Sequence, residues 1–301
     1  MTTQQSTPPD WRQRPERSNI PVIRTMVWIA LHLGRGAART LLYPICLYFL
    51  LCSPRARTAS ADFLERVLGR RPRLLERLLH YHRFAATILD RVYFLNDQAK
   101  DFDIRLHCPA DVEALLAGTG GVVLLGAHLG SFEAIRAVGR RRAQAAVKLV
   151  MYEENARKLN AVLGAINPAL GQEIIGLGHC DSMLKVQECL ERGDLVGLLA
   201  DRALAGEKRI WRPFLGVPAG FPLGPFRIAS MLRRPIVLMV GLYRGQARYD
   251  IHFELLQDAA EPARGQRTMQ LEDTVTRYAE RLEHYCRTDP FNWFNFYDFW
   301  A

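Results

Sequence analysis

The stretch GVVLLGAHLGSFEAIR, residues 121–136, gives the clearest indication of the fold. Its apolar run over 122–125 leads into a polar turn with two glycines, and a segment of helical character follows over 133–142. A short apolar run that is bounded by turn residues and followed by a helix is typical of a buried strand in an α/β sheet. We therefore predict a strand that ends near Gly126 and a helix that begins near Glu133.

The same alternation continues through residues 106–301. Predicted strands lie at 122–125, 147–151, 173–176, 195–199, 235–242 and 249–256. Predicted helices lie at 133–142, 156–166, 182–192, 225–233 and 267–286. Apolar strands that are separated by helices predict a mostly parallel central sheet, covered by helices. We accordingly predict an α/β domain over 106–301.

The composition limits the choice of partners. The chain has 301 residues and a formal net charge of +9, with 40 Lys and Arg against 31 Asp and Glu. A basic surface suits anionic lipid, an acidic carrier protein or nucleic acid. The absence of zinc-finger spacing, of an RNP-like motif and of a lysine-rich tail argues against nucleic acid. The six cysteines form no C-x-x-C, which predicts free thiols and no metal site.

The region before the α/β domain differs in character. Residues 1–20 are polar and contain prolines, so we predict that they are disordered. Residues 21–105 form a helical arm that begins with two apolar stretches, 27–33 and 41–52, around GRGAAR at 34–39. Neither stretch alone reaches the roughly 20 residues that cross a bilayer. Arginine-rich amphipathic helices follow.

This arm has two interpretations. In one, it is a buried core helix that Pro44 kinks. In the other, which we favour, it is an anchor that lies in the plane of the membrane or inserts shallowly, with Trp28, Tyr43 and Tyr48 at the depth of the headgroups. The arginines that follow would then contact anionic lipid.

The turn of the opening stretch contains the candidate acid–base residues. His128 follows the predicted strand, at the edge of an α/β sheet where sites collect. Glu133 lies five residues further and can meet it only across a bend, for which Gly126 and Gly130 supply the backbone freedom. A carboxylate that accepts the imidazole N–H would leave the other nitrogen free to deprotonate a hydroxyl. The alternative is a structural histidine. Ser131 is the candidate N-cap of the helix.

GAHLGSFEA, residues 126–134, resembles the His-x4-acid block of the glycerolipid acyltransferase superfamily, and its glutamate form resembles the bacterial lipid A lauroyl/myristoyl acyltransferase family. A second block, LVGLLADRALAG (195–206) with WRPFLGVPAGFPLGPFRIASMLRRPIV (211–237), resembles the strand of that family that ends in Asp, and its loop and helix. The similarity extends over most of the chain. It implies a glycerolipid acyltransferase-like fold.

The resemblance also implies the reaction and the roles of residues. His128 would be the general base, oriented by Glu133. Asp201 occupies the aspartate position of the family. Backbone N–H groups near Gly130 and Ser131, or Arg202, would hold the oxyanion that forms on the thioester carbonyl. No metal or cofactor is needed, because the histidine performs the proton transfer.

The resemblance further implies the partners and the location. The donor would be acyl carrier protein, or alternatively acyl-CoA, and the acceptor a lipid or glycolipid hydroxyl. The protein would sit on the cytoplasmic face of the bacterial inner membrane, against anionic lipid. Nucleic acid is not expected.

Two departures from the family pattern concern the acceptor. The segment NAVLGAINP, residues 160–168, lacks the arginine that family members often have there, and the nearest basic residues are Arg157 and Lys158, which we include as candidate substrate contacts. After Trp293 the tail continues as FNFYDFW, aromatic and acidic rather than basic. This tail is more similar to that of the lipid acyltransferases of aryl-polyene gene clusters.

Two other functions remain open at this point. An acyl-thioester or lipid hydrolase would transfer the acyl group to water, but the chain has no G-x-S-x-G nucleophile motif. An inactive membrane-binding scaffold would not need a His–Glu pair together with Asp201.

Overall fold

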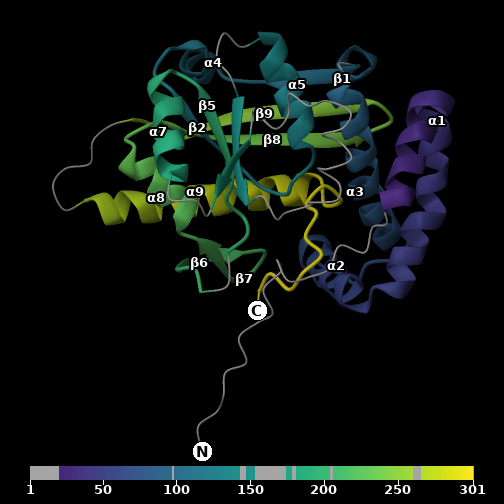
Figure 1. The fold of residues 1–301 in the computed structure, drawn as a ribbon. Coiled ribbons are helices and arrows are strands. Elements are labelled where there is room, and N and C mark those ends of the chain that lie inside the picture. The colour runs from purple at the N-terminus through teal and green to yellow at the C-terminus, as the bar shows by residue number, and fades with distance from the viewer. Residues whose placement is uncertain are drawn as a thin grey trace, which may run out of the picture.

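The computed structural model describes residues 20–96, 98–142, 147–152, 174–177, 181–203, 206–259 and 266–300. A seven-stranded sheet forms its centre, in the order β1-β9-β8-β2-β5-β3-β4 (Figure 1). The strands are β1 (Asp103–His107), β2 (Val122–Gly126), β3 (Val147–Tyr152), β4 (Ile174–Leu177), β5 (Leu195–Leu199), β8 (Ile236–Gly245) and β9 (Arg248–Gln257). All neighbouring pairs are parallel except β8 with β9. The prediction of an α/β fold with a mostly parallel sheet is confirmed.

Helices cover both faces of this sheet. They are α1 (Ile20–Cys52), α2 (Pro54–Leu68), α3 (Leu74–Leu95), α4 (Ala110–Ala117), α5 (Phe132–Arg142), α7 (Ser182–Glu191), α8 (Gly224–Met231) and α9 (Arg267–Thr288), with a short 3-10 turn at Ala99–Asp101. Successive residues of a strand point to opposite faces. Val123 and Leu125 of β2 accordingly join one core with α7, α8 and α9, and Val122 and Leu124 join the other with α1, α3, α4 and α5.

The first helix breaks at a glycine. Gly34 has φ 84° and ψ 169°, outside the helical region, whereas Pro44 lies inside the helix. A residue with a β-carbon disfavours this positive φ, so the glycine explains where the helix breaks. The structure thus shows a break at Gly34, which the sequence analysis did not predict.

A buried ion pair connects this helix to the rest of the protein just after the break. Arg35 donates through Nε and Nη2 to the two oxygens of Asp90 on α3, at 2.7 and 2.8 Å, and Tyr249 of β9 donates to the same carboxylate at 2.7 Å. Asp90 is fully buried. The guanidinium of Arg39 lies over the ring of Tyr243, 5.4 Å from the ring centroid. Both arginines of GRGAAR thus point toward the protein.

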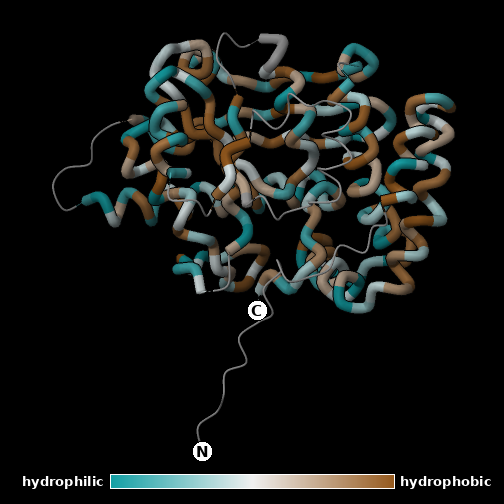
Figure 2. Tube along the Cα trace, in the orientation of Figure 1, coloured by the Kyte–Doolittle hydropathy of each residue, from teal (hydrophilic) through white to brown (hydrophobic). Residues whose placement is uncertain are grey.

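The outer side of α1 is apolar and uncovered. Its exposed large side chains include Trp28, Leu33, Tyr43, Tyr48 and Leu51, and Figure 2 shows hydrophobic residues along this helix at the edge of the molecule. Among the described residues, no single helix is both long and apolar enough to cross a membrane, whereas α1 and α2, which meet at a bend of 98°, satisfy the criteria of length and composition together.

A small hairpin differs from the sequence-based expectation. The Gly- and Pro-rich segment after residue 208 forms a two-stranded antiparallel unit, β6 (Arg209–Phe214) and β7 (Val217–Pro222). Leu215 and Gly216 connect the strands with φ of 51° and 87°, and two central residues with positive φ are typical of a tight hairpin turn. The predicted helix at 156–166 and residue Glu173 lie outside the described residues.

Candidate active site

His128 and Asp201 lie beyond the ends of two neighbouring strands. Strands β2 and β5 are parallel partners, and Gly126 at the end of β2 is in register with Leu199 at the end of β5. Each of the two polar residues follows its strand end by two positions. Parallel strands bring their carboxyl ends to one edge of the sheet, where sites in α/β proteins form. The two side chains therefore meet, although they are distant in sequence.

The imidazole of His128 is oriented by Asp201. Nδ1 of His128 lies 2.9 Å from Oδ1 of Asp201, and the backbone N–H of His128 donates to Oδ2 of the same carboxylate at 2.9 Å. Only a protonated Nδ1 can donate to an ionised carboxylate, so this contact places the ring proton on Nδ1. Nε2 is then the basic nitrogen. Asp201 is 1% exposed and the side chain of His128 is 29% exposed, so solvent or substrate reaches the histidine and not the carboxylate.

The charges around the pair favour a neutral histidine next to an ionised aspartate. Burial lowers the pKa of His128, and the nearby Arg202 lowers it further, against the raising effect of Asp201. For Asp201, burial alone would raise the pKa, but the interactions with His128 and Arg202 outweigh burial and hold the pKa at about 2. At neutral pH the histidine is therefore available to accept a proton.

The turn that carries His128 depends on Gly130. Its φ is 72°, and a β-carbon built there would lie 1.9 Å from the carbonyl oxygen of Gly241 on β8. The N–H of Gly130 donates to the carbonyl of Asn292 at 2.8 Å, and the N–H of Ser131 donates to the carbonyl of Gly241 at 2.7 Å. These two N–H groups already have acceptors within the protein. This differs from their expected role as oxyanion donors.

Ser131 acts at the start of α5, as expected of an N-cap. Its Oγ accepts the N–H of Ala134 at 3.3 Å, and its side chain is buried. A hydroxyl that is held in this way supports the helix terminus.

Glu133 has other partners than the expected imidazole. Its carboxylate accepts from Arg91 of α3 at 2.8 Å and from Arg136 of α5 at 3.1 Å. Glu133 and Arg136 are each 3% exposed, so this is a buried ion-pair cluster that joins two helices. The carboxylate that bonds the imidazole is that of Asp201. Asp201 is the partner of the imidazole because it follows the end of the neighbouring strand β5 and reaches Nδ1 directly. Glu133 instead lies within α5, and its carboxylate contacts Arg91 of α3.

Arg202 lies beside the pair and contacts the C-terminal segment. Its Nη2 donates to the carbonyl of Phe294 at 2.9 Å, and its guanidinium lies 5.1 Å from the ring centroid of Tyr297. The other two candidate substrate contacts, Arg157 and Lys158, lie outside the described residues.

The C-terminal segment is the part of the site that the sequence analysis did not identify. Trp293 donates through Nε1 to Oδ2 of Asp201 at 3.1 Å, and the N–H of Phe294 donates to the carbonyl of His128 at 2.7 Å. The family resemblance includes a tryptophan at the start of the tail, and this residue was the sequence feature that could have indicated a role for the segment in the site. Its contact with a strand end far earlier in the chain is a property of the tertiary structure alone.

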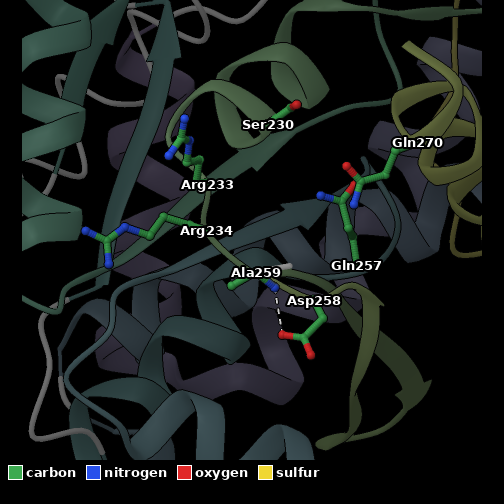
Figure 3. Close-up of a pocket in the computed structure, with 7 residues that line it drawn as sticks. All are labelled: Ser230, Arg233, Arg234, Gln257, Asp258, Ala259 and Gln270. Carbon is green, nitrogen blue, oxygen red and sulfur yellow. Dashed lines mark hydrogen bonds between the residues drawn. The ribbon is translucent and has the colours of Figure 1, made fainter. Parts of the chain in front are cut away.

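A small pocket elsewhere is not part of this site. It is lined by residues from the end of α8, the start of α9 and the end of β9, namely Ser230, Arg233, Arg234, Gln257, Asp258, Ala259 and Gln270 (Figure 3). It lies near the start of β8, which pairs with the start of β2, whereas His128 follows the end of β2. Among the described residues, no group of three His, Cys, Asp or Glu is arranged to hold a metal ion.

The fold and the site define a class of protein. A histidine that is fixed by a buried carboxylate at the carboxyl edge of a mostly parallel sheet has the arrangement that lets an imidazole accept a proton from a hydroxyl. The sequence matches the family of bacterial lipid A biosynthesis acyltransferases over residues 26–301. The chain belongs to this family, which indicates an acyltransferase that acts on lipid. No curated protein is significantly similar to it.

Proposed function

We propose that this protein transfers a fatty acyl chain from a thioester, on acyl carrier protein or alternatively on CoA, to a hydroxyl group of a lipid or glycolipid. The observation that carries the proposal is the hydrogen bond from His128 Nδ1 to the buried Asp201, which leaves Nε2 as a base at the accessible side. The geometry is that of a His–carboxylate pair in which the hydroxyl of the acceptor replaces a serine nucleophile.

The proposed reaction has two steps. The acceptor oxygen attacks the thioester carbonyl carbon while His128 Nε2 takes the hydroxyl proton, and a tetrahedral oxyanion forms. The oxyanion then collapses, the carbon–sulfur bond breaks, and the imidazolium returns the proton to the leaving thiolate. Asp201 stabilises the imidazolium between the two steps. Arg202 is the proposed donor to the oxyanion.

Hydrolysis is the competing reaction. Ser131 is the serine of the turn, and its Oγ accepts the N–H of Ala134, so it supports the helix and is no candidate nucleophile.

The purified protein should be incubated with acyl-ACP or acyl-CoA, each with and without lipid acceptors. Release of thiol that requires an acceptor supports transfer. Release without acceptor supports hydrolysis, and no release supports a scaffold.

We further propose that the protein binds the cytoplasmic face of the inner membrane through one end of the arm. Tyr93 contacts the carbonyl of Ala30, and Arg35 contacts Asp90, so α1 and α3 are antiparallel. The end of α1 thus lies near the start of α3, where exposed apolar and basic residues gather: Tyr48, Leu51, Leu74, Leu75, Arg55, Arg70, Arg71 and Arg73. We call this set the basal patch. Apolar side chains among arginines suit an anionic bilayer.

The position of the basal patch supports access of a lipid acceptor to the site. His80 of α3 contacts the carbonyl of Trp293, whose indole contacts Asp201, so the start of α3 and the candidate site share one end of the molecule. An acceptor that diffuses in the membrane would then reach His128 from the bilayer.

Binding to vesicles tests this part of the proposal. The double variant Leu51→Glu with Leu75→Glu should lose binding to vesicles of phosphatidylglycerol and phosphatidylethanolamine, because charged side chains do not insert. Met269→Glu, at an equally exposed methionine of α9, is the matched control and should bind like the parent. Unchanged binding of the double variant would contradict the role of the patch. Deleting α1 is a poorer test, since Ala38, Leu42 and Leu50 belong to the core.

A further inference from the structure

The C-terminal segment is built into the turn that carries the candidate base. Leu129 and Trp293 form an antiparallel bridge, flanked by the bonds from Gly130 N–H to the Asn292 carbonyl at 2.8 Å and from Phe294 N–H to the His128 carbonyl at 2.7 Å. The side chain of Asn292 in turn bonds both the N–H and the carbonyl of Tyr243 on β8. The segment therefore fixes the turn against the sheet.

Within this segment, the indole of Trp293 reaches the carboxylate that orients the histidine. Nε1 donates to Oδ2 of Asp201 at 3.1 Å, and the same oxygen accepts the backbone N–H of His128 at 2.9 Å. Two donors on Oδ2 leave Oδ1 to face the imidazole, at 2.9 Å from Nδ1. The indole N–H thus contributes to the rotation of the carboxylate about its Cβ–Cγ bond, and hence to the orientation of the base.

The indole has no freedom to move away. Trp293 is fully buried, and its ring packs against Phe63 of α2, Phe214 of β6 and Phe299, with centroid distances of 4.9, 5.3 and 4.8 Å. Its carbonyl also accepts the Nε2–H of His80 at 2.8 Å, and Nδ1 of His80 accepts from the hydroxyl of Ser60 at 2.8 Å. The arm helices α2 and α3 therefore hold the tryptophan in place.

We infer that Trp293 is a positioning residue of the reaction, which acts through Asp201 on His128. This inference rests on the proposed function, because it assumes that His128 is the base. The expected consequence of losing the N–H is a misaligned carboxylate and a less well oriented imidazole. Binding of the acyl donor should not change, since the indole is buried behind Asp201.

The test removes the N–H with as little change in packing as the side chain allows. Trp293→Phe removes the donor with some loss of volume, and benzothienylalanine at position 293 removes it at nearly the same shape. Phe94→Leu is the matched control, since it removes an equally buried ring that packs on Phe102 and Tyr249 and leaves the indole and its neighbours in place. Loss of a hydrogen bond to a charged group corresponds to a decrease of about 10- to 100-fold. We expect kcat to fall by about this factor in both variants, with the KM for acyl donor within about twofold of the parent.

A second readout reports the orientation of the histidine itself. In protein labelled with ¹⁵N-histidine, the Nδ1 proton of His128 should give a downfield signal that His128→Ala and Asp201→Ala remove. Its exchange with water should be at least about tenfold faster in the benzothienylalanine variant and unchanged in Phe94→Leu. A parental kcat or a parental exchange rate in the benzothienylalanine variant would overturn the inference. Activity in His128→Ala would instead overturn the proposed function, so the two failures are distinct.

Discussion

His128 and Asp201 each lie two residues beyond the end of a strand, and the two strands, β2 and β5, are neighbours in the sheet. This relationship places Nδ1 of the histidine 2.9 Å from Oδ1 of the buried aspartate. The pair fixes the tautomer of His128, while burial and Arg202 lower its pKa against the raising effect of Asp201.

Asp201→Asn should lower the plateau of kcat by roughly 10²- to 10⁴-fold, because an amide does not stabilise the imidazolium. The pH dependence gives a second, signed expectation. The active histidine is neutral, so activity falls as the pH drops through its pKa. Asp201 raises that pKa, and its loss should move the acid limb of kcat/KM to lower pH. Asp258→Asn, in the pocket of Figure 3, is the control. A limb that moves to higher pH would contradict the assignment.

Arg202→Ala should have the opposite effect on the same limb. The guanidinium lowers the pKa of His128, so its removal should shift the acid limb to higher pH. Turnover should also fall, by about 10²- to 10³-fold if Arg202 stabilises the oxyanion. Arg287→Ala, an exposed arginine of α9, should leave both unchanged. The measurement is kcat/KM against pH for both variants. An unmoved limb in Arg202→Ala would show that its charge does not act on His128.

Glu133→Gln should reduce the stability of the fold. The variant leaves Arg136, which is 3% exposed, next to a neutral amide, and breaking a buried ion pair costs about 3 kcal/mol or more. Asp62→Asn removes a more exposed pair with Arg66 and should cost less than about 1 kcal/mol. Urea unfolding of both variants measures the difference. An inactive Glu133→Gln protein with parental stability would show that Glu133 takes part in the chemistry, as the resemblance implies.

Gly130→Ala should prevent the turn from forming. The new β-carbon would lie 1.9 Å from the carbonyl oxygen of Gly241, in addition to the unfavourable φ of 72°. Gly216→Ala is a matched control, because Gly216 has φ 87° but nothing within 4 Å of the added carbon. The control should lose only about 1–2 kcal/mol from its left-handed backbone. Thermal unfolding should show a much larger loss for Gly130→Ala, and equal losses would mean that the turn can shift away from β8.

The sequence predicts the strand at 122–125 and the positions of His128 and Asp201 after strand ends, because apolar runs and turn residues are local signals. It does not predict that β2 and β5 are neighbours. The choice between Asp201 and Glu133 as the partner of the imidazole depends on that neighbour relationship. The spacing between His128 and Glu133 is local and visible in the sequence, whereas the contact with Asp201 spans 73 residues.

The same limit explains the tail and the arm. Trp293 follows α9 and reaches the site only because the C-terminal segment returns to the turn at Leu129. The break of α1 at Gly34 is a property of its backbone conformation, which no local sequence signal indicates. In the sequence, Arg35 and Arg39 are expensive charges in an apolar stretch. In the structure, Arg35 faces Asp90 on α3, which no periodicity of α1 indicates.

Acyl transfer by a folded His128→Ala variant is the most direct test of the general base. The parent and the variant should be compared with an acyl thioester donor and a lipid acceptor, after thermal unfolding has shown that the variant is native. Loss of the base should lower the rate of transfer by at least about 10²-fold, since no other side chain of the described site is placed to accept the proton that Nε2 would take. Transfer by the folded variant at a rate close to that of the parent would contradict the role of His128.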